Sequence, residues 1–144
     1  AYQSRGLGDV YKRQIYNYLL RKSNKKYSII YSLDGYDEIS LTNDTKIYSN
    51  NYERILKSKE FELENLKASE IKGGFDIPSS SKIFMNVLNG AGTESQNNVV
   101  CANAGIAISI SKNISIKEGF ELAKESLISS KALDSFNKLK KIMA

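Results

Sequence analysis

The chain has 144 residues, 41% of them hydrophobic, and a formal net charge of +5. The length suits one globular domain with its own core and is too short for two. The single cysteine, Cys101, excludes an intrachain disulfide, and the lack of histidine excludes Ser-His-Asp and Cys-His catalysis and histidine-bound zinc from this chain alone. No run of about 18 apolar residues predicts a membrane span, so we expect a cytoplasmic protein.

The first fourteen residues contain a segment that resembles a sequencing adapter. Residues 9–14, D-V-Y-K-R-Q, can be back-translated as GAT GTG TAT AAG AGA CAG, which resembles the end of a transposon used to prepare sequencing libraries. We therefore interpret residues 1–14 as a non-native tail and apply fold arguments to residues 15–144. Without the four charged residues of this tail the net charge falls to +3. On this interpretation the natural chain begins well upstream of Ile15, whereas a natural disordered tail is the alternative.

The next part of the chain predicts a helix followed by short strands. Residues 15–22 place apolar side chains at helical spacing, and residues 27–33, Y-S-I-I-Y-S-L, predict a largely buried strand. D-G-Y-D-E then reads as a turn. We expect two further short strands at 39–42 and 45–48, and a strand or irregular segment at 53–63.

The second half predicts helices with clear ends. Gly73-Gly74 is a break, and Pro78 suits the first turn of a helix that ends at Asn89-Gly90. Two capping-box patterns, Thr93-x-x-Gln96 and Ser115-x-x-Glu118, predict the starts of the next two helices.

The composition of these last helices predicts how they pack. The first is rich in small and apolar residues, which favours burial on most sides, and close packing would compensate for Gly105 within it. The second carries an apolar stripe of Phe120, Ala123 and Leu127. A final amphipathic helix carries its apolar face at Ala132, Leu133, Phe136, Leu139 and Met143, with lysines in its last turns. Cys101 lies in the apolar helix, so we expect a buried, inert thiol rather than a nucleophile.

Three acids surround Gly35 at the end of the first predicted strand. In parallel and mixed α/β sheets, ligands collect outside the carboxyl ends of the strands. Mg²⁺ takes one or two protein carboxylates together with water and substrate phosphates. Asp37 and Glu38 fit that demand, while Gly35 allows a close bend and Asp34 can cap the turn. A solvated surface turn is the alternative, and local composition does not decide between the two.

The acidic segment also resembles a known family. S-L-D-G-Y-D-E-I-S-L-T-N-D-T-K-I-Y is similar to the metal-binding segment of anthranilate phosphoribosyltransferase. The resemblance continues in order through K-G-G at 72–74, F-M-N-V-L-N-G at 84–90, N-V-V-C-A-N-A at 98–104 and the segment 118–133. It implies an α/β fold in which residues 15–144 form the carboxyl-terminal part of the family's large domain, with a few mixed strands followed by a helical half.

The resemblance also implies a function. Asp37 and Glu38 would bind Mg²⁺ associated with the diphosphate of phosphoribosyl pyrophosphate, whose phosphoribosyl group the family transfers to anthranilate in tryptophan biosynthesis. The family's glycine-rich pyrophosphate loop, its anthranilate-binding residues and the helical domain through which it forms homodimers have no counterpart here. We therefore expect the chain alone to be inactive. Tyr31-Ser32 stands where the family often has histidine, and I-P-S-S-S follows the double glycine where the family has Asn-Ala.

Two other functions stay open at this point. A pyrimidine nucleoside phosphorylase shares the large-domain architecture, although D-G-Y-D-E-I-S argues against it. A noncatalytic relative could bind nucleic acid through lysines such as Lys25-Lys26, Lys57 with Lys59, and Lys138 with Lys140-Lys141. These lysines are scattered and lack interleaved aromatic residues, so we expect no nucleic-acid partner.

Overall fold

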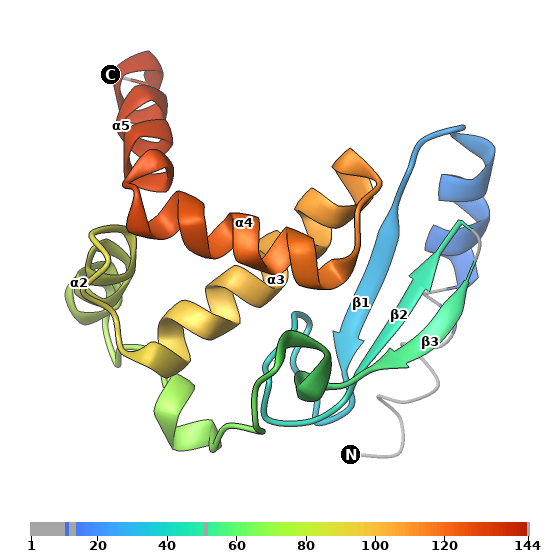
Figure 1. Cartoon of the computed structure of the whole chain (residues 1–144), viewed down its shortest axis with the longest axis horizontal. Helices are drawn as coiled ribbons and strands as arrows, with labels where there is room; N and C mark the ends of the chain where they lie inside the picture. The colour runs from blue at the N-terminus through green and yellow to red at the C-terminus, as the bar shows by residue number, and fades with distance from the viewer. Residues whose placement is uncertain (1–10, 12–13, 51, 144) are drawn as a thin grey trace.

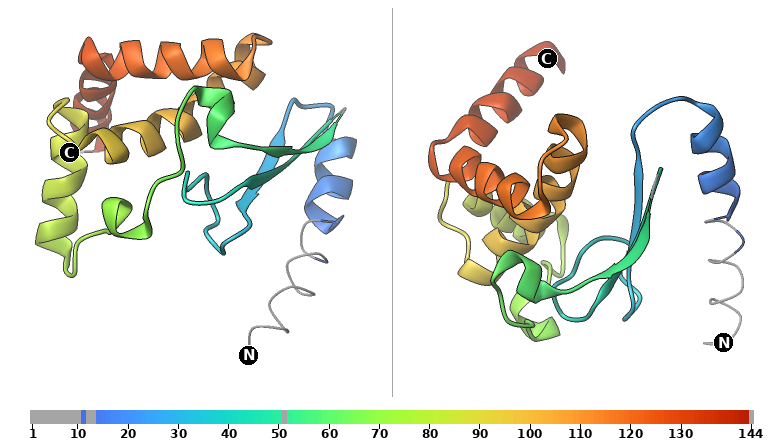
Figure 2. Two further views of the ribbon diagram at one scale, coloured as in Figure 1. Left: turned by 60° about the horizontal axis from the view of Figure 1, so that its bottom comes forward. Right: turned by 45° about the vertical axis from the view of Figure 1, so that its right-hand side comes forward.

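The computed structural model describes residue 11 and residues 14–50 and 52–143. In this part of the chain a helix over residues 14–22 precedes three strands, and the strands precede the remaining helices (Figure 1). The sheet lies on one side of the molecule together with the helix over residues 14–22, and the later helices lie on the other side, as the turned views of Figure 2 also show. This arrangement confirms the predicted α/β class, a few strands followed by a helical half. The predicted non-native tail, residues 1–14, lies almost entirely outside the described residues.

The three strands form an antiparallel meander in the order β1-β2-β3. They are β1 (Ser28–Ser32), β2 (Thr45–Ser49) and β3 (Glu53–Leu56). Both pairings are antiparallel, where mixed strands had been expected. Ile47 in the central strand is fully buried, but four of the five residues of β1 are only half buried. The prediction of a largely buried strand at 27–33 is therefore wrong in degree, because β1 lies at an edge of the described sheet.

The strand expected at residues 39–42 is absent, and that prediction is wrong. Residues 39–41 are buried but pair with no strand, and a bend begins at Leu41. Leu41 has a φ of +58°, which interrupts an extended backbone. The Leu41 carbonyl accepts from the Leu66 amide at 2.8 Å, and the backbone of Ile39 is bound by the side chain of Asn103. Ile39 and Leu41 are therefore buried, but their backbone groups bond to Leu66 and Asn103 instead of to a neighbouring strand.

The helices begin and end near the predicted residues. Pro78 lies in the first turn of its helix, which ends at Asn89. Residues 53–63, expected as a strand or irregular segment, contain β3 and a 3-10 helix. The short 3-10 helices and the α-helices are η1 (Ser58–Phe61), η2 (Ala68–Ile71), α2 (Ile77–Leu88), α3 (Glu94–Lys112), α4 (Ile116–Ile128) and α5 (Lys131–Met143).

Both predicted capping boxes are present. The Thr93 hydroxyl accepts from the Gln96 amide at 3.2 Å at the start of α3. The Ser115 hydroxyl accepts from the Glu118 amide at 3.1 Å at the start of α4, and the Glu118 carboxylate accepts from the Ser115 amide in return. These contacts satisfy amides that the first turn of a helix leaves unpaired.

The core forms where α3 and α4 cross. Apart from its two end residues, helix α3 is buried or half buried except for a stripe at positions 100, 104, 107 and 111. The predicted α4 stripe of Phe120, Ala123 and Leu127 is buried. A Cβ added at Gly105 would stand 2.8 Å from the Phe120 backbone. The close packing expected to compensate for Gly105 is therefore confirmed. Phe61 of η1 packs on the Phe120 ring at 5.1 Å between centroids, which joins the region after the sheet to this core.

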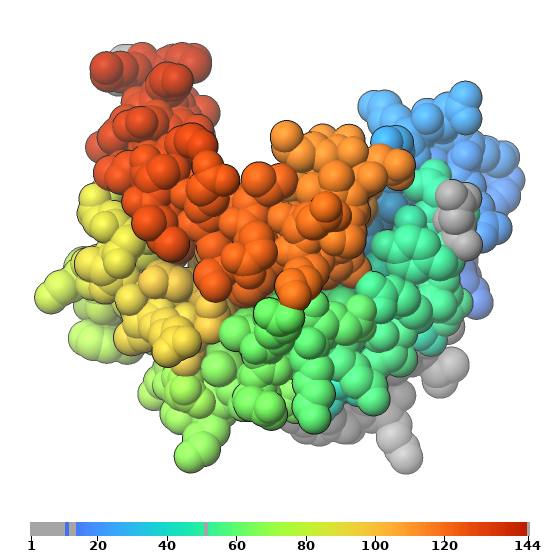
Figure 3. Space-filling view, in the orientation of Figure 1, coloured from blue at the N-terminus to red at the C-terminus, as the bar shows by residue number. Residues whose placement is uncertain are grey.

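The apolar face of the last helix, α5, is only partly covered by the rest of the chain. Phe136 contacts Phe84 of α2 with ring centroids 5.1 Å apart, but Leu139 and Met143 are mostly exposed. Figure 3 shows α5 projecting from the rest of the molecule. No single helix among the described residues is long and apolar enough to cross a membrane. Only α3 and α4 taken together pass that test of length and composition, and the pair is bent by 117°.

Candidate metal-binding site

The acidic segment forms a tight bend directly after β1, as predicted. The Gly35 amide donates to the Ser32 carbonyl at 3.2 Å, and the Ser32 amide donates to the Tyr36 carbonyl at 2.9 Å. Gly35 has a φ of +98°, a conformation that side chains disfavour, so the glycine is required for the bend. Asp37 and Glu38 follow, and both are exposed.

Asp34 turns into a network of hydroxyl groups beneath the bend. Its carboxylate accepts from the hydroxyls of Thr42 and, at 3.4 Å, of Ser40. The Ser40 hydroxyl also lies 2.8 Å from that of Ser32, which is buried. Partial burial raises the pKa of Asp34, but hydrogen bonds from Thr42, Ser32, its own amide and Ser40 outweigh it, so the pKa is below its ordinary value. Asp34 is thus held as a structural carboxylate, although mainly by the hydroxyls of Thr42 and Ser40 and not only by its own backbone as predicted.

The other side of the bend is held by a side chain distant in sequence. The Asn103 amide group of α3 accepts from the Ile39 N–H at 2.9 Å and donates to the Ile39 carbonyl at 2.8 Å. Sequence reasoning missed this contact, because the two residues lie 64 positions apart. No local pattern in N-V-V-C-A-N-A indicates which asparagine faces the bend. Ser40 and Thr42 were likewise missed, since their alternation with apolar residues had predicted a strand.

The carboxylates of Asp37 and Glu38 are accessible to a bound ion. No salt bridge or side-chain hydrogen bond joins either carboxylate to another residue of the described chain. The same part of the chain contains no group of three or more acidic, cysteine or histidine residues that could hold a metal by itself. Two neighbouring carboxylates of this kind fit Mg²⁺, which retains water and adds substrate phosphates, but do not form an all-protein metal cage.

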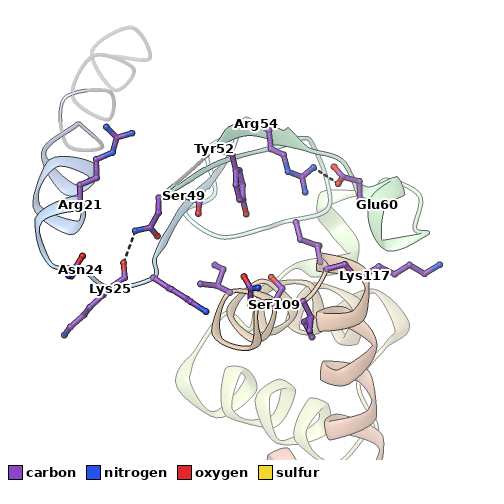
Figure 4. Close-up of a pocket in the computed structure, with 16 residues that line it drawn as sticks. Arg21, Asn24, Lys25, Ser49, Tyr52, Arg54, Glu60, Ser109 and Lys117 are labelled. Carbon is purple, nitrogen blue, oxygen red and sulfur yellow. Dashed lines mark hydrogen bonds and ion pairs between the residues drawn. The ribbon is translucent and has the colours of Figure 1, made fainter.

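Of three well-formed cavities among the described residues, the most voluminous lies away from this bend. It measures about 850 Å³ and opens between the start of β1, the end of β2 and the junction of α3 with α4 (Figure 4). Its lining is mainly basic, with five cationic residues and a single carboxylate, Glu60, which pairs with Arg54 at 2.6 Å. Of the lysines considered for nucleic-acid binding, only Lys25 and Lys26 line it. None of the three cavities includes Asp37 or Glu38.

Cys101 has no place in the chemistry of this site. Its side chain is buried, as predicted, and burial raises the pKa of the thiol above its ordinary value. A protonated, enclosed thiol is a poor nucleophile.

Comparisons with known proteins agree with the resemblance seen in the sequence. The profile described as "Glycosyl transferase family, a/b domain" matches residues 10–133. The chain is 57% identical over 129 residues to the anthranilate phosphoribosyltransferase of Christiangramia forsetii, covering 90% of this chain and 39% of that protein. The enzyme of the same name from Bacteroides thetaiotaomicron is 37% identical over 139 residues, covering 96% of this chain and 42% of that protein. The chain therefore spans about 39% of the length of the first curated relatives that it matches.

Solved structures show the same fold. Anthranilate phosphoribosyltransferase from Thermus thermophilus superposes with a TM-score of 0.72 at 22% identity, covering 79% of this chain and 34% of that one. The Saccharomyces cerevisiae enzyme in complex with PRPP and Mg superposes with a TM-score of 0.67 at 24% identity, covering 78% and 32%. The predicted family resemblance is confirmed: the chain belongs to the glycosyl transferase family and forms part of its a/b domain.

Proposed function

We propose that the chain is the carboxyl-terminal part of the a/b domain of an anthranilate phosphoribosyltransferase. The complete protein would transfer phosphoribosyl from phosphoribosyl pyrophosphate to anthranilate, a step of tryptophan biosynthesis. The observation that supports this best is an exposed bend with two neighbouring carboxylates, neither paired within the described chain, in a sequence 57% identical to an enzyme of that name.

The site residues act through charge and position. Bound Mg²⁺ would neutralise the negative charge that grows on pyrophosphate as it leaves the ribose carbon. Asp37 and Glu38 would hold the ion from the protein side, leaving its other positions to water and phosphate oxygens. Gly35 and the Asp34 network keep the two acids on a fixed turn beside β1. The anthranilate amine attacks the ribose carbon directly, so this chain need supply no nucleophile, in keeping with the buried Cys101.

Neutralising both acids tests the proposal. In the complete protein, Asp37→Asn combined with Glu38→Gln should lower turnover by about 100-fold or more, because charge stabilisation of the leaving group is lost. The melting temperature should change little, since both side chains are exposed and unpaired in the described chain.

The matched control removes the same charge elsewhere on the surface. Glu64→Gln with Asp134→Asn also removes two exposed carboxylates and should leave turnover near wild type. Wild-type turnover in the Asp37/Glu38 variant, measured at limiting Mg²⁺, would contradict the assignment.

A further inference from the structure

The contact between Asn103 and the acidic bend is a two-point clamp. Its side-chain oxygen accepts from the Ile39 N–H, and its side-chain nitrogen donates to the Ile39 carbonyl and, at 2.9 Å, to the Val99 carbonyl of its own helix. Only Asn and Gln side chains carry a donor and an acceptor side by side in this way. One side chain thus satisfies both backbone polar groups of Ile39, the residue directly after Glu38.

The clamp answers a local need of the backbone. Ile39 is 1% exposed and belongs to no strand, so its buried N–H and C=O need partners from elsewhere. A buried backbone group left without a partner destabilises the fold, because it loses its bonds to water and gains none in return. Because Asn103 also bonds back to Val99, its amide is oriented by α3, an element packed into the core against α4.

The two acids therefore lie between two fixed points. On one side, the Tyr36 carbonyl accepts from the Ser32 amide of β1 at 2.9 Å. On the other side, Asn103 holds Ile39. Only Asp37 and Glu38 lie between these anchors, so the backbone that carries the acids has little freedom.

We propose that Asn103 is a positioning residue for the metal-binding bend. It sets the backbone of Ile39, and with it the direction of Glu38, without touching metal or substrate itself. This inference rests on the proposed role of Asp37 and Glu38. Residues that orient metal ligands from behind affect metal affinity by about 10–100-fold when they are changed.

The test compares Asn103 variants in the complete protein by calorimetric titration with phosphoribosyl pyrophosphate at several Mg²⁺ concentrations. Asn103→Ala should weaken Mg²⁺-dependent binding by about tenfold or more. Turnover should recover at saturating Mg²⁺, while the KM for anthranilate stays near wild type. A purely structural defect would not be rescued by the metal.

Two matched variants separate the clamp from general effects on α3. Asn103→Asp keeps an acceptor for the Ile39 N–H but loses the donor, so it should show the same shift in Mg²⁺ dependence. Asn97→Ala removes another α3 amide, which donates to the Gly92 carbonyl at 3.3 Å, and should leave Mg²⁺ dependence unchanged. An unchanged Mg²⁺ dependence in Asn103→Ala, or an equal shift in Asn97→Ala, would overturn the proposal.

A measurement on the unaltered protein decides the matter if the Asn103 variants do not fold. The Ile39 amide should be protected from hydrogen exchange in the absence of any ligand, and rapid exchange there would refute the clamp. The two proposals also fail in different ways. Wild-type turnover in the Asp37/Glu38 variant would contradict the proposed metal site. If that variant loses turnover but Asn103→Ala keeps a normal Mg²⁺ dependence, only the positioning role of Asn103 is contradicted.

Discussion

Carboxylates a few residues apart have different surroundings in the acidic bend. Asp34 accepts hydrogen bonds from Thr42 and Ser40, while Asp37 and Glu38 are exposed and unpaired within the described chain. The sequence suggested this division of roles, because Asx turns use the first acid of such a segment. The hydroxyl partners became visible only in the fold.

The Asp34 network makes a pH-dependent contribution to stability. The folded pKa of Asp34 lies below its ordinary value of 3.8, so the ionised form is stabilised in the folded protein. The contribution is fully present above the unfolded pKa and is lost as pH falls through the folded pKa. Asp34→Asn should therefore lower the melting temperature at pH 7, through a loss of about 1 kcal/mol or less, because solvent screens this exposed carboxylate. The difference from wild type should shrink towards zero below pH 3.8; a difference that is constant with pH would contradict this account.

The ends of the helices are set by neighbouring residues, whereas the packing of α3 on α4 depends on one close tertiary contact. The capping boxes at Thr93 and Ser115 and the end of α2 at Asn89 were predicted from neighbouring residues alone. The crossing of α3 and α4 depends on two glycines that face each other. A Cβ at Gly119 would collide with the Gly105 carbonyl oxygen, so the helix backbones pack directly on each other.

Filling this contact should destabilise the fold. Gly119→Ala adds one methyl group where backbone atoms leave no room, and overpacking of this kind costs about 1–3 kcal/mol. Gly73→Ala makes the same change where nothing lies within 4 Å, so its effect should be much smaller. Thermal melting of both variants measures the difference, and equal stability would show that α3 and α4 can separate without cost.

At the scale of the whole molecule, the acidic bend and the basic cavity lie at opposite ends of β1. The cavity includes Lys26, which precedes the strand, whereas the bend follows Ser32. The described chain thus presents carboxylates at one end and cations at the other. Asp37 and Glu38 are exposed and line none of these three cavities, a position that suits ligands of a hydrated ion.

This arrangement predicts that the chain has no activity by itself. Catalysis of group transfer requires both substrates to be held in position, and the proposed role of the two carboxylates would position only the metal and its diphosphate. Anthranilate consumption, followed by its fluorescence, should stay at background for residues 15–144 with Mg²⁺ and phosphoribosyl pyrophosphate. The complete protein should be active under the same conditions. Turnover by the chain alone would show that it contains contacts to anthranilate that we have not identified.

The sequence by itself determined the features that depend on neighbouring residues: the bend at Gly35, the helix caps, the break at Gly73-Gly74 and the candidate ligands Asp37 and Glu38. These follow from backbone conformation and hydrogen bonds that close within a few positions. It also predicted a short strand at residues 39–42, but periodicity does not say which partner satisfies the backbone there.

Only the tertiary structure decided that Asn103 takes this role, that residues 39–42 bend instead of forming a strand, and that α5 leaves apolar residues exposed. The physical reason is the same in each case. A buried N–H or C=O requires a partner, and an apolar face requires a cover, but neither requirement specifies the partner's position in the chain. That position is set by how the helices pack, through contacts between residues as far apart as Ile39 and Asn103.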